Sequence, residues 1–290
     1  MNANALYKRS SSVSSTKYIL NCSEKITENN PTTKDWLNNL KFLKTISRTK
    51  SEQMTHKKIL EGILMKKHDV VIKISDTEEN LKYEYDIYQK LVEYKVKGIL
   101  HYICYFECMD NIKNINEKRD GICEGTGNNT RILVMEYIKN KSFGLYAWEN
   151  SNQIKSCLKQ LLCTCLDAFL KCGFIHGNLN CNNILIKNTK STTVTYIING
   201  KVIIIPLYGF KIKLMDFESS KTGGTIKQFY KDFRYKFASS FTEYIGGEVE
   251  FINNQAVKKL YDLFVKYYEE CIHNKDSLWV FDLFPIIDKL

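Results

Sequence analysis

Residues 174–186 decide the fold of this chain, and they read FIHGNLNCNNILI. A second stretch, LMDFES, follows at residues 214–219, and a third, VVIKIS, comes before both at residues 70–75. Runs of Val, Ile and Leu such as these favour β-strands. The first stretch therefore predicts a polar loop that leads into a strand. The second predicts a strand that ends in a charged turn, and the third predicts a strand that carries a lysine.

On the N-terminal side, residues 57–74 predict two strands that meet at the polar turn 66–69. The segment after them is expected to form an amphipathic helix with Ser75 as its N-cap and acidic residues in its first turn. Apolar residues recur there at helical spacing: Leu81, Tyr85, Tyr88 and Leu91. Two more strands, near 100–108 and 131–138, flank a polar segment that predicts a surface loop.

On the C-terminal side, residues 151–173 predict an apolar helix that ends at Gly173. Residues 192–207 predict a hairpin that turns at Asn199 and Gly200. The remainder, residues 225–290, predicts helices. We therefore expect an α+β fold in three parts. Residues 1–35 form a disordered tail rich in Ser and Asn, 36–138 form a β-rich lobe with one helix, and 139–290 form a mainly helical lobe.

Composition excludes several classes of protein. The chain has 290 residues, of which 44% are hydrophobic, so global disorder is excluded. Its formal net charge of +10 favours acidic or phosphate-bearing partners, but the basic residues are spread out, and no specific nucleic-acid motif is expected. No apolar run is long enough for a membrane span, and the N-terminus lacks a signal-peptide core. We expect an intracellular protein, cytoplasmic or nuclear, whose ten cysteines are reduced.

Taken together, the three stretches resemble the protein kinase family. That family carries a strand lysine, a catalytic loop of the form H-x-D-L-x-x-x-N-I-L and an Asp-Phe-Gly turn, in this order. The resemblance extends over about residues 55–265. It implies a two-lobe fold that holds ATP and Mg²⁺ in the cleft between a small β-rich lobe and a larger helical lobe.

The resemblance also implies which residues bind the nucleotide. Lys73 would contact the α- and β-phosphates and would be held by a carboxylate from the helix, for which Glu84 is the first candidate and Asp86 the fallback. The stretch ILVMEYI at residues 132–138 resembles the hinge, where adenine meets backbone groups. Four residues form this predicted hinge: Met135, Glu136, Tyr137 and Ile138.

Four further residues have roles implied by the family. Asp216 would hold Mg²⁺, and Asn183 would supply the second metal contact. His176 resembles the structural histidine of the family, a buried side chain rather than a proton shuttle. Asp232 resembles the aspartate at a helix start that accepts backbone N–H bonds from the catalytic loop. Each of these residues also has a plain structural interpretation, as a turn former, a buried histidine or a surface charge.

The chain departs from the family pattern at three places. Asn178 occupies the position of the catalytic aspartate, so the basic carboxylate is missing. No glycine-rich loop comes before Lys73, and only Gly62 lies in that region. Glu218 replaces the glycine of the Asp-Phe-Gly turn, which is expected to remove backbone freedom and to add a negative charge beside the metal position.

These departures leave three function classes open. The first is a pseudokinase or strongly impaired Ser/Thr kinase that binds ATP and Mg²⁺ and acts through a protein partner. The second is an active Ser/Thr protein kinase that uses a substitute base. The third is a small-molecule kinase, because Asp-Phe-Glu also resembles the choline kinase and aminoglycoside phosphotransferase type. In style the chain is similar to the compact kinases of large DNA viruses, which would place it in a host cell or a virion.

Overall fold

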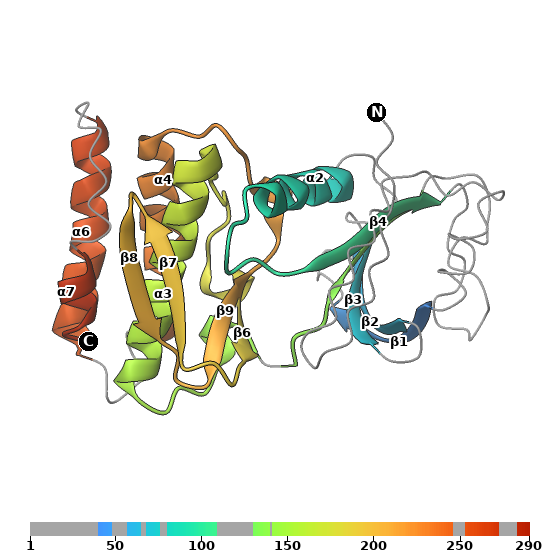
Figure 1. The fold of residues 1–290 in the computed structure, drawn as a ribbon, viewed down its shortest axis with the longest axis horizontal. Coiled ribbons are helices and arrows are strands. Elements are labelled where there is room, and N and C mark those ends of the chain that lie inside the picture. The colour runs from blue at the N-terminus through green and yellow to red at the C-terminus, as the bar shows by residue number, and fades with distance from the viewer. Residues whose placement is uncertain are drawn as a thin grey trace. The chain divides into compact units, whose positions relative to one another are not determined.

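The computed structural model contains two compact units (Figure 1). The first unit comprises Met1–Tyr85 and His101–Tyr137, and the second comprises Asp86–Leu100 and Ile138–Leu290. The predicted tail at 1–35 and most of the predicted surface loop lie outside the described residues. The structure describes residues 40–47, 57–64, 68–75, 80–108, 130–139, 141–245, 253–272 and 283–290.

The first unit is built on an antiparallel sheet of five strands in the order β1-β2-β3-β5-β4. Side chains alternate between the two faces of a strand. In β3, Val70, Ile72 and Ile74 are buried on one face, while Lys73 is on the other face. The four strands predicted in this unit are confirmed as β2 (Lys57–Leu64), β3 (His68–Ser75), β4 (Tyr102–Cys108) and β5 (Thr130–Glu136). The edge strand β1 (Leu40–Ser47) was not predicted.

The predicted amphipathic helix is α2 (Asn80–Glu93), and all four of its expected apolar positions are buried. The prediction for its start is wrong. Ser75 is the last residue of β3, where it pairs with Lys57 and Arg131, and the first turn of α2 holds no acidic residue. Because sheet pairing determines the backbone of Ser75, this residue cannot take the role of an N-cap.

The second unit contains the predicted long helix, α3 (Ser151–Cys172), which is confirmed at both ends. The Asn150 side chain accepts a hydrogen bond from the Gln153 N–H, and Gly173 ends the helix in the left-handed conformation with φ of 63°. The predicted hairpin is also confirmed. It joins β7 (Thr193–Ile198) to β8 (Lys201–Pro206), and both of its turn residues have positive φ, 50° at Asn199 and 72° at Gly200. A two-residue hairpin turn of this kind needs such angles.

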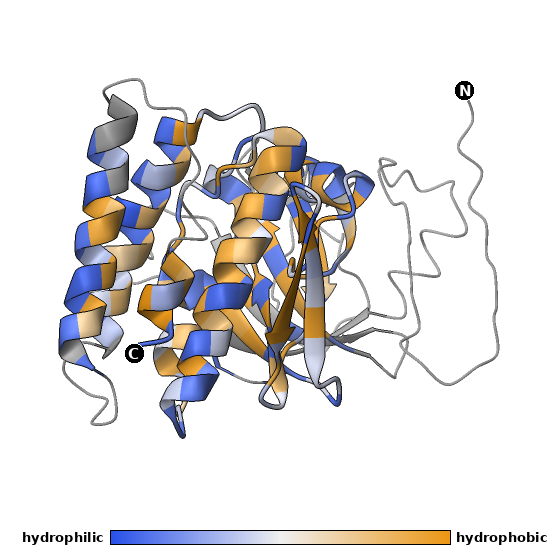
Figure 2. Ribbon diagram, turned by 60° about the vertical axis from the view of Figure 1, so that its left-hand side comes forward, coloured by the Kyte–Doolittle hydropathy of each residue, from blue (hydrophilic) through white to orange (hydrophobic). Residues whose placement is uncertain are grey.

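The other elements of the second unit are a second pair of strands, a run of helices and three short turns. A capping box between Thr225 and Gln228 starts the helical run α4–η4–α5, in which η4 is a π-helix. Helices of this unit carry both hydrophobic and hydrophilic residues (Figure 2). The bounds are β6 (Ile184–Asn188), β9 (Phe210–Leu214), α4 (Ile226–Asp232), η4 (Phe233–Ala238), α5 (Ser239–Ile245), α6 (Asn254–Ile272), α7 (Phe284–Ile287), η1 (Phe143–Leu145), η2 (Cys181–Asn183) and η3 (Phe217–Ser219).

The predicted α+β fold class, with one β-rich part and one mainly helical part, is confirmed. A small antiparallel sheet dominates the first unit, and helices dominate the second. Among the described residues, no helix is both long enough and apolar enough to cross a membrane.

Candidate active site

In the first unit, Lys73 of β3 forms a buried ion pair with Glu84 of α2. The Lys73 Nζ atom lies 3.1 Å from Glu84 Oε1 and 3.0 Å from Oε2. The Tyr102 hydroxyl donates a second hydrogen bond to Glu84 Oε1. Glu84 has no exposed surface, and a carboxylate in such a place needs a cation and hydrogen-bond donors to remain charged. The fallback residue, Asp86, is exposed. The pair therefore holds the lysine ammonium in one position.

The predicted hinge follows β5. Met135 is buried in that strand. The Glu136 N–H donates to the carbonyl of His101 at 2.8 Å, and the Glu136 side chain accepts from the His101 N–H at 3.0 Å. The Tyr137 N–H donates to the carbonyl of Asp69 at 3.3 Å. The N–H groups of Glu136 and Tyr137 are thus used within the first unit, and Met135 is paired inside the sheet.

In the second unit, strand register brings Asn183 and Asp216 to the same end of the β6–β9 pair. Ile184 is paired with Leu214, and one residue further on the Met215 N–H donates to the Asn183 carbonyl at 3.1 Å. The Asn183 Nδ2 atom donates to the Asn178 carbonyl at 2.9 Å, so its Oδ1 atom, the one suited to a metal, is not used in that bond. An amide oxygen and a carboxylate are hard ligands that fit Mg²⁺.

Asn178 lies in the loop before η2, where its side chain is held by a second asparagine. The Asn180 Nδ2 atom donates to Asn178 Oδ1 at 3.2 Å and to the Asn178 carbonyl at 3.3 Å. Asn180 also caps η2 by accepting from the Asn182 N–H at 2.9 Å. The loop therefore positions the amide at residue 178, but that amide has no basic oxygen comparable to a carboxylate.

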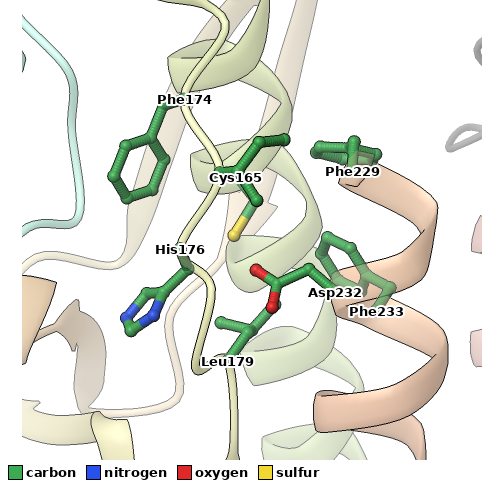
Figure 3. A pocket seen from close by; sticks show the side chains of 8 residues that line it. Cys165, Phe174, His176, Leu179, Phe229, Asp232 and Phe233 are labelled. Carbon is green, nitrogen blue, oxygen red and sulfur yellow. The ribbon is translucent and has the colours of Figure 1, made fainter. Parts of the chain in front are cut away.

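Asp232 of α4 points its carboxylate towards the predicted catalytic loop, which carries His176 and Leu179 (Figure 3). Its Oδ2 atom accepts from the Gly177 N–H at 3.0 Å, and its carboxylate also accepts from the N–H groups of His176 and Leu179. The prediction that Asp232 stands at a helix start is wrong, because it is the last residue of α4. The capping box at Thr225 starts the helix earlier in the chain.

His176 is buried, and its ring packs against Phe217 with ring centroids 5.7 Å apart. Its Nε2 atom is 2.9 Å from the Met215 carbonyl, and its own carbonyl accepts from the Ser220 hydroxyl at 2.7 Å. The same ring lines a small pocket together with Cys165, Phe174 and Asp232 (Figure 3). These contacts connect the loop that carries His176 to the turn at Asp216. His176 is therefore a positioning residue.

The Asp216 turn tolerates glutamate in place of the family's glycine. The left-handed residue of this turn is Asp216, with φ of 68°, while Glu218 lies in the short helix η3 without a positive φ. The expected loss of backbone freedom at Glu218 therefore causes no strain. The glycine that the site does need is Gly177. It has φ of 77°, and an added Cβ would lie 2.1 Å from the Ser219 carbonyl oxygen.

We predict that the His176 imidazole titrates below the ordinary value of about 6.5. Burial lowers its pKa more than the nearby Asp232 and Asp216 charges raise it. Because the folded state disfavours the charged ring, the unfolding free energy should fall as the pH drops through the unfolded pKa. An NMR titration of the proton on His176 Cε1 would measure the pKa of the ring. The resonance is assigned as the signal that is lost in His176→Gln. A pKa at or above 6.5 would contradict the prediction.

The residues of the site that were not predicted include Gly177, described above, and also Tyr102 and Asn180. Tyr102 contacts Glu84 from 18 positions away in the chain, so no local pattern could indicate it. Asn180 lies in the loop 174–186 and is the N-cap of η2. Asparagine often caps a following turn through its side chain, so this role could have been predicted from the residue type. Among the described residues, no group of three or more His, Cys, Asp or Glu side chains could hold a metal ion by itself.

The comparisons with known proteins agree with this geometry. Residues 58–197 match the family model RIO1, described as the RIO domain, which is an atypical protein-kinase-like family. The match covers Lys73, Glu84, Asn178 and Asn183, and it ends before Asp216. No curated protein matches the chain. The chain is therefore protein-kinase-like, and over residues 58–197 it is similar to a RIO domain.

Proposed function

We propose that this protein binds ATP with Mg²⁺ and has lost most of the phosphoryl-transfer rate of a Ser/Thr protein kinase. It would then act as a pseudokinase or a strongly impaired kinase in regulation or binding. The buried Lys73–Glu84 pair carries the proposal. A buried ion pair is weak evidence for stability as such, because its desolvation cost offsets its attraction. The combination of this pair with an amide at residue 178, in one chain, favours a protein that binds nucleotide without efficient transfer.

The residues of both units suit the parts of this ligand. Lys73, held by Glu84, offers a positioned cation to the phosphates. Asn183 Oδ1 and the Asp216 carboxylate offer two hard oxygen ligands. Bound Mg²⁺ would neutralise charge on the phosphates. Met135 and the backbone of Glu136, Tyr137 and Ile138 would contact adenine.

The absence of a carboxylate at residue 178 determines how fast we expect phosphoryl transfer to be. A positioned general base contributes a factor of about 10² to 10⁴, or roughly 3 to 5 kcal/mol of barrier. The Asn178 amide can orient a substrate hydroxyl through a hydrogen bond, but it cannot take the proton. We therefore expect slow transfer even with nucleotide and metal in place.

We predict that ATP with Mg²⁺ stabilises the wild-type protein, by about 2.7 kcal/mol at 100 times the dissociation constant. A thermal-shift titration measures this. Asp216→Asn should abolish most of the shift, because it removes the carboxylate while asparagine tolerates the left-handed backbone. Asp262→Asn, at an exposed position of α6, is the matched control and should retain the full shift. No shift in the wild type, or an equal shift in Asp216→Asn, would contradict nucleotide binding at this site.

The two alternatives differ in what they phosphorylate. An active Ser/Thr kinase with a substitute base would label generic protein substrates at an ordinary rate. A small-molecule kinase of the choline kinase or aminoglycoside phosphotransferase type would label choline or an aminoglycoside instead. Radiolabelled ATP offered with each acceptor in turn distinguishes both from the proposed protein, for which we expect barely detectable transfer to any of them.

A further inference from the structure

Arg234 of η4 lies against the rings of two tyrosines. Its Cζ atom is 4.7 Å from the ring centroid of Tyr235 in the same element and 5.0 Å from that of Tyr268 in α6. The two rings are edge to face, with centroids 5.4 Å apart. Aromatic rings at these distances attract a guanidinium through their negative faces and hold it in place. We call Arg234, Tyr235 and Tyr268 the arginine cluster.

The guanidinium of Arg234 is stacked on rings but has few polar contacts. Its Nε atom is buried and, among the described residues, has no hydrogen-bond partner, whereas Nη1 and Nη2 are not enclosed in this way. Nη1 lies 3.9 Å from Glu269 Oε1, which is too long for a hydrogen bond, and the Glu269 side chain is 58% exposed. A guanidinium has five N–H donors in a fixed fork. The Nη side of the fork can therefore donate to an anion that approaches from solvent.

Two exposed lysines lie on the same side of this helical run as Arg234. Lys231 precedes Arg234 by three positions, and Lys227 precedes Lys231 by four. Residues at these spacings are neighbours on a helix surface. The backbone stays helical across the junction of α4 and η4, with φ of −65° at Asp232 and −64° at Phe233. Long side chains on a helix lean towards its N-terminus, so Arg234 leans towards the turn that carries Lys231.

The described carboxylates of α4 and α6 leave this side positive. Asp232 is buried, and its carboxylate accepts the Gly177 N–H in the other direction. Asp262 is seven residues before Glu269, which is about 10 Å along α6. Among the described residues, Glu269 is the only carboxylate within 4 Å of Arg234. Because Glu269 is exposed and makes no hydrogen bond to Arg234, an anion of higher charge can displace it.

We propose that Arg234 and Lys231 bind a phosphate group, carried by inorganic phosphate or by a phosphorylated protein side chain. A phosphate monoester has a charge of about −1.5 to −2 at pH 7 and three strong acceptor oxygens. Two oxygens can accept from the fork of Arg234, while Lys231 meets the remaining charge. The π-helical form of η4 supports the proposal, because such turns are rare and occur frequently at functional sites. The proposal does not depend on nucleotide binding, because neither residue belongs to the candidate active site.

The test follows the Arg234 Nε–H signal in ¹⁵N NMR spectra of the full-length protein, without nucleotide or Mg²⁺. The sequence has five arginines, so this signal can be assigned as the one that is lost in Arg234→Lys. Inorganic phosphate and a phosphoserine peptide should each shift the signal saturably, and the same peptide with serine should not. Tighter binding of the phosphopeptide would identify a protein side chain as the source of the phosphate. Equal binding would identify the free ion.

Three variants distinguish phosphate binding from a purely structural role of the cluster. Arg234→Lys keeps the charge but removes the fork, and calorimetry should show binding weakened about tenfold or more. Lys231→Gln should weaken binding about two- to fivefold. Glu269→Gln should strengthen it by about the same factor, because that carboxylate competes for Arg234. Lys258→Gln and Glu93→Gln, at exposed positions of α6 and α2, are the matched controls and should bind like the wild type.

The proposal would be overturned if neither phosphate ligand shifted the Arg234 signal, or if sodium acetate at the same ionic strength shifted it equally. Unchanged affinity in both Lys231→Gln and Glu269→Gln would also overturn it, because a purely structural role predicts no effect of these exposed charges. Both variants remain informative if Arg234→Lys destabilises the helices. Binding of a DNA oligonucleotide without any response to the phosphate monoesters would assign the cluster to phosphodiesters and overturn the proposal.

Discussion

Replacing Asn178 by aspartate should raise the rate of phosphoryl transfer about 10²-fold or more. The change is nearly isosteric, and the bond from Asn180 Nδ2 to the residue-178 Oδ1 atom can be retained by a carboxylate oxygen. The new carboxylate would accept the hydroxyl proton of the substrate as the bond to phosphorus forms. Radiolabelled ATP with the same panel of protein and small-molecule acceptors measures both proteins.

The matched control for this variant is Asn182→Asp. It adds the same charge four positions along the loop, at an exposed residue whose Nδ2 atom donates to the Tyr244 hydroxyl. It should leave the transfer rate unchanged. An efficient wild type that gains little from Asn178→Asp would show that another group orients the hydroxyl. If both proteins bind ATP and neither transfers phosphate, the missing glycine-rich loop or the charge of Glu218 is the remaining candidate.

Glu84→Ala should destabilise the first unit by about 3 to 5 kcal/mol, because the Lys73 charge would stay buried without the Glu84 carboxylate. The Tyr102 hydroxyl would lose its hydrogen bond to Glu84 as well. Hydrogen exchange of the segments 68–75 and 130–136 measures this locally, and protection there should fall about 10²-fold or more. The effect would appear without any nucleotide.

Asp86→Ala provides the control on the same helix. Asp86 is exposed, and a surface change of this kind should alter stability by no more than about 0.5 kcal/mol. The double variant Lys73→Met/Glu84→Gln should recover much of the stability lost in Glu84→Ala, because it removes both buried charges. Unchanged protection in Glu84→Ala would show that the pair does not organise the first unit.

The two parts of the site differ in how they are supported. Register in the β6–β9 pair brings Asn183 and Asp216 together, and this depends only on backbone hydrogen bonds. Asp232 and His176 then connect the catalytic loop to the run of helices and to the Asp216 turn. The loop at residues 176–183 is held by these contacts, and of the kinase pattern it lacks only the carboxylate at residue 178. We therefore expect a large gain in transfer rate from the single substitution Asn178→Asp.

Most of the fold could be predicted because its signals are local. Apolar spacing indicated α2, and a long apolar run indicated α3. The residue types Asn and Gly, which tolerate positive φ, indicated the turn at Asn199 and Gly200 and the end of α3 at Gly173. The N-cap at Ser75 was wrong because a serine suits both a cap and a strand end. Only pairing with Lys57 and Arg131, which are distant in the chain, decides between them.

The sequence by itself determined the types and the order of the site residues: a strand lysine, an amide in place of a carboxylate at residue 178, and Asn183 followed by Asp216. Tertiary structure alone decided that Glu84 and not Asp86 meets Lys73, and that Asp216 and not Glu218 takes the left-handed backbone. The physical reason is that residue identity and spacing determine local structure, within one turn, one helix or one strand. Burial, charge pairing and sheet register depend on which distant segments pack together.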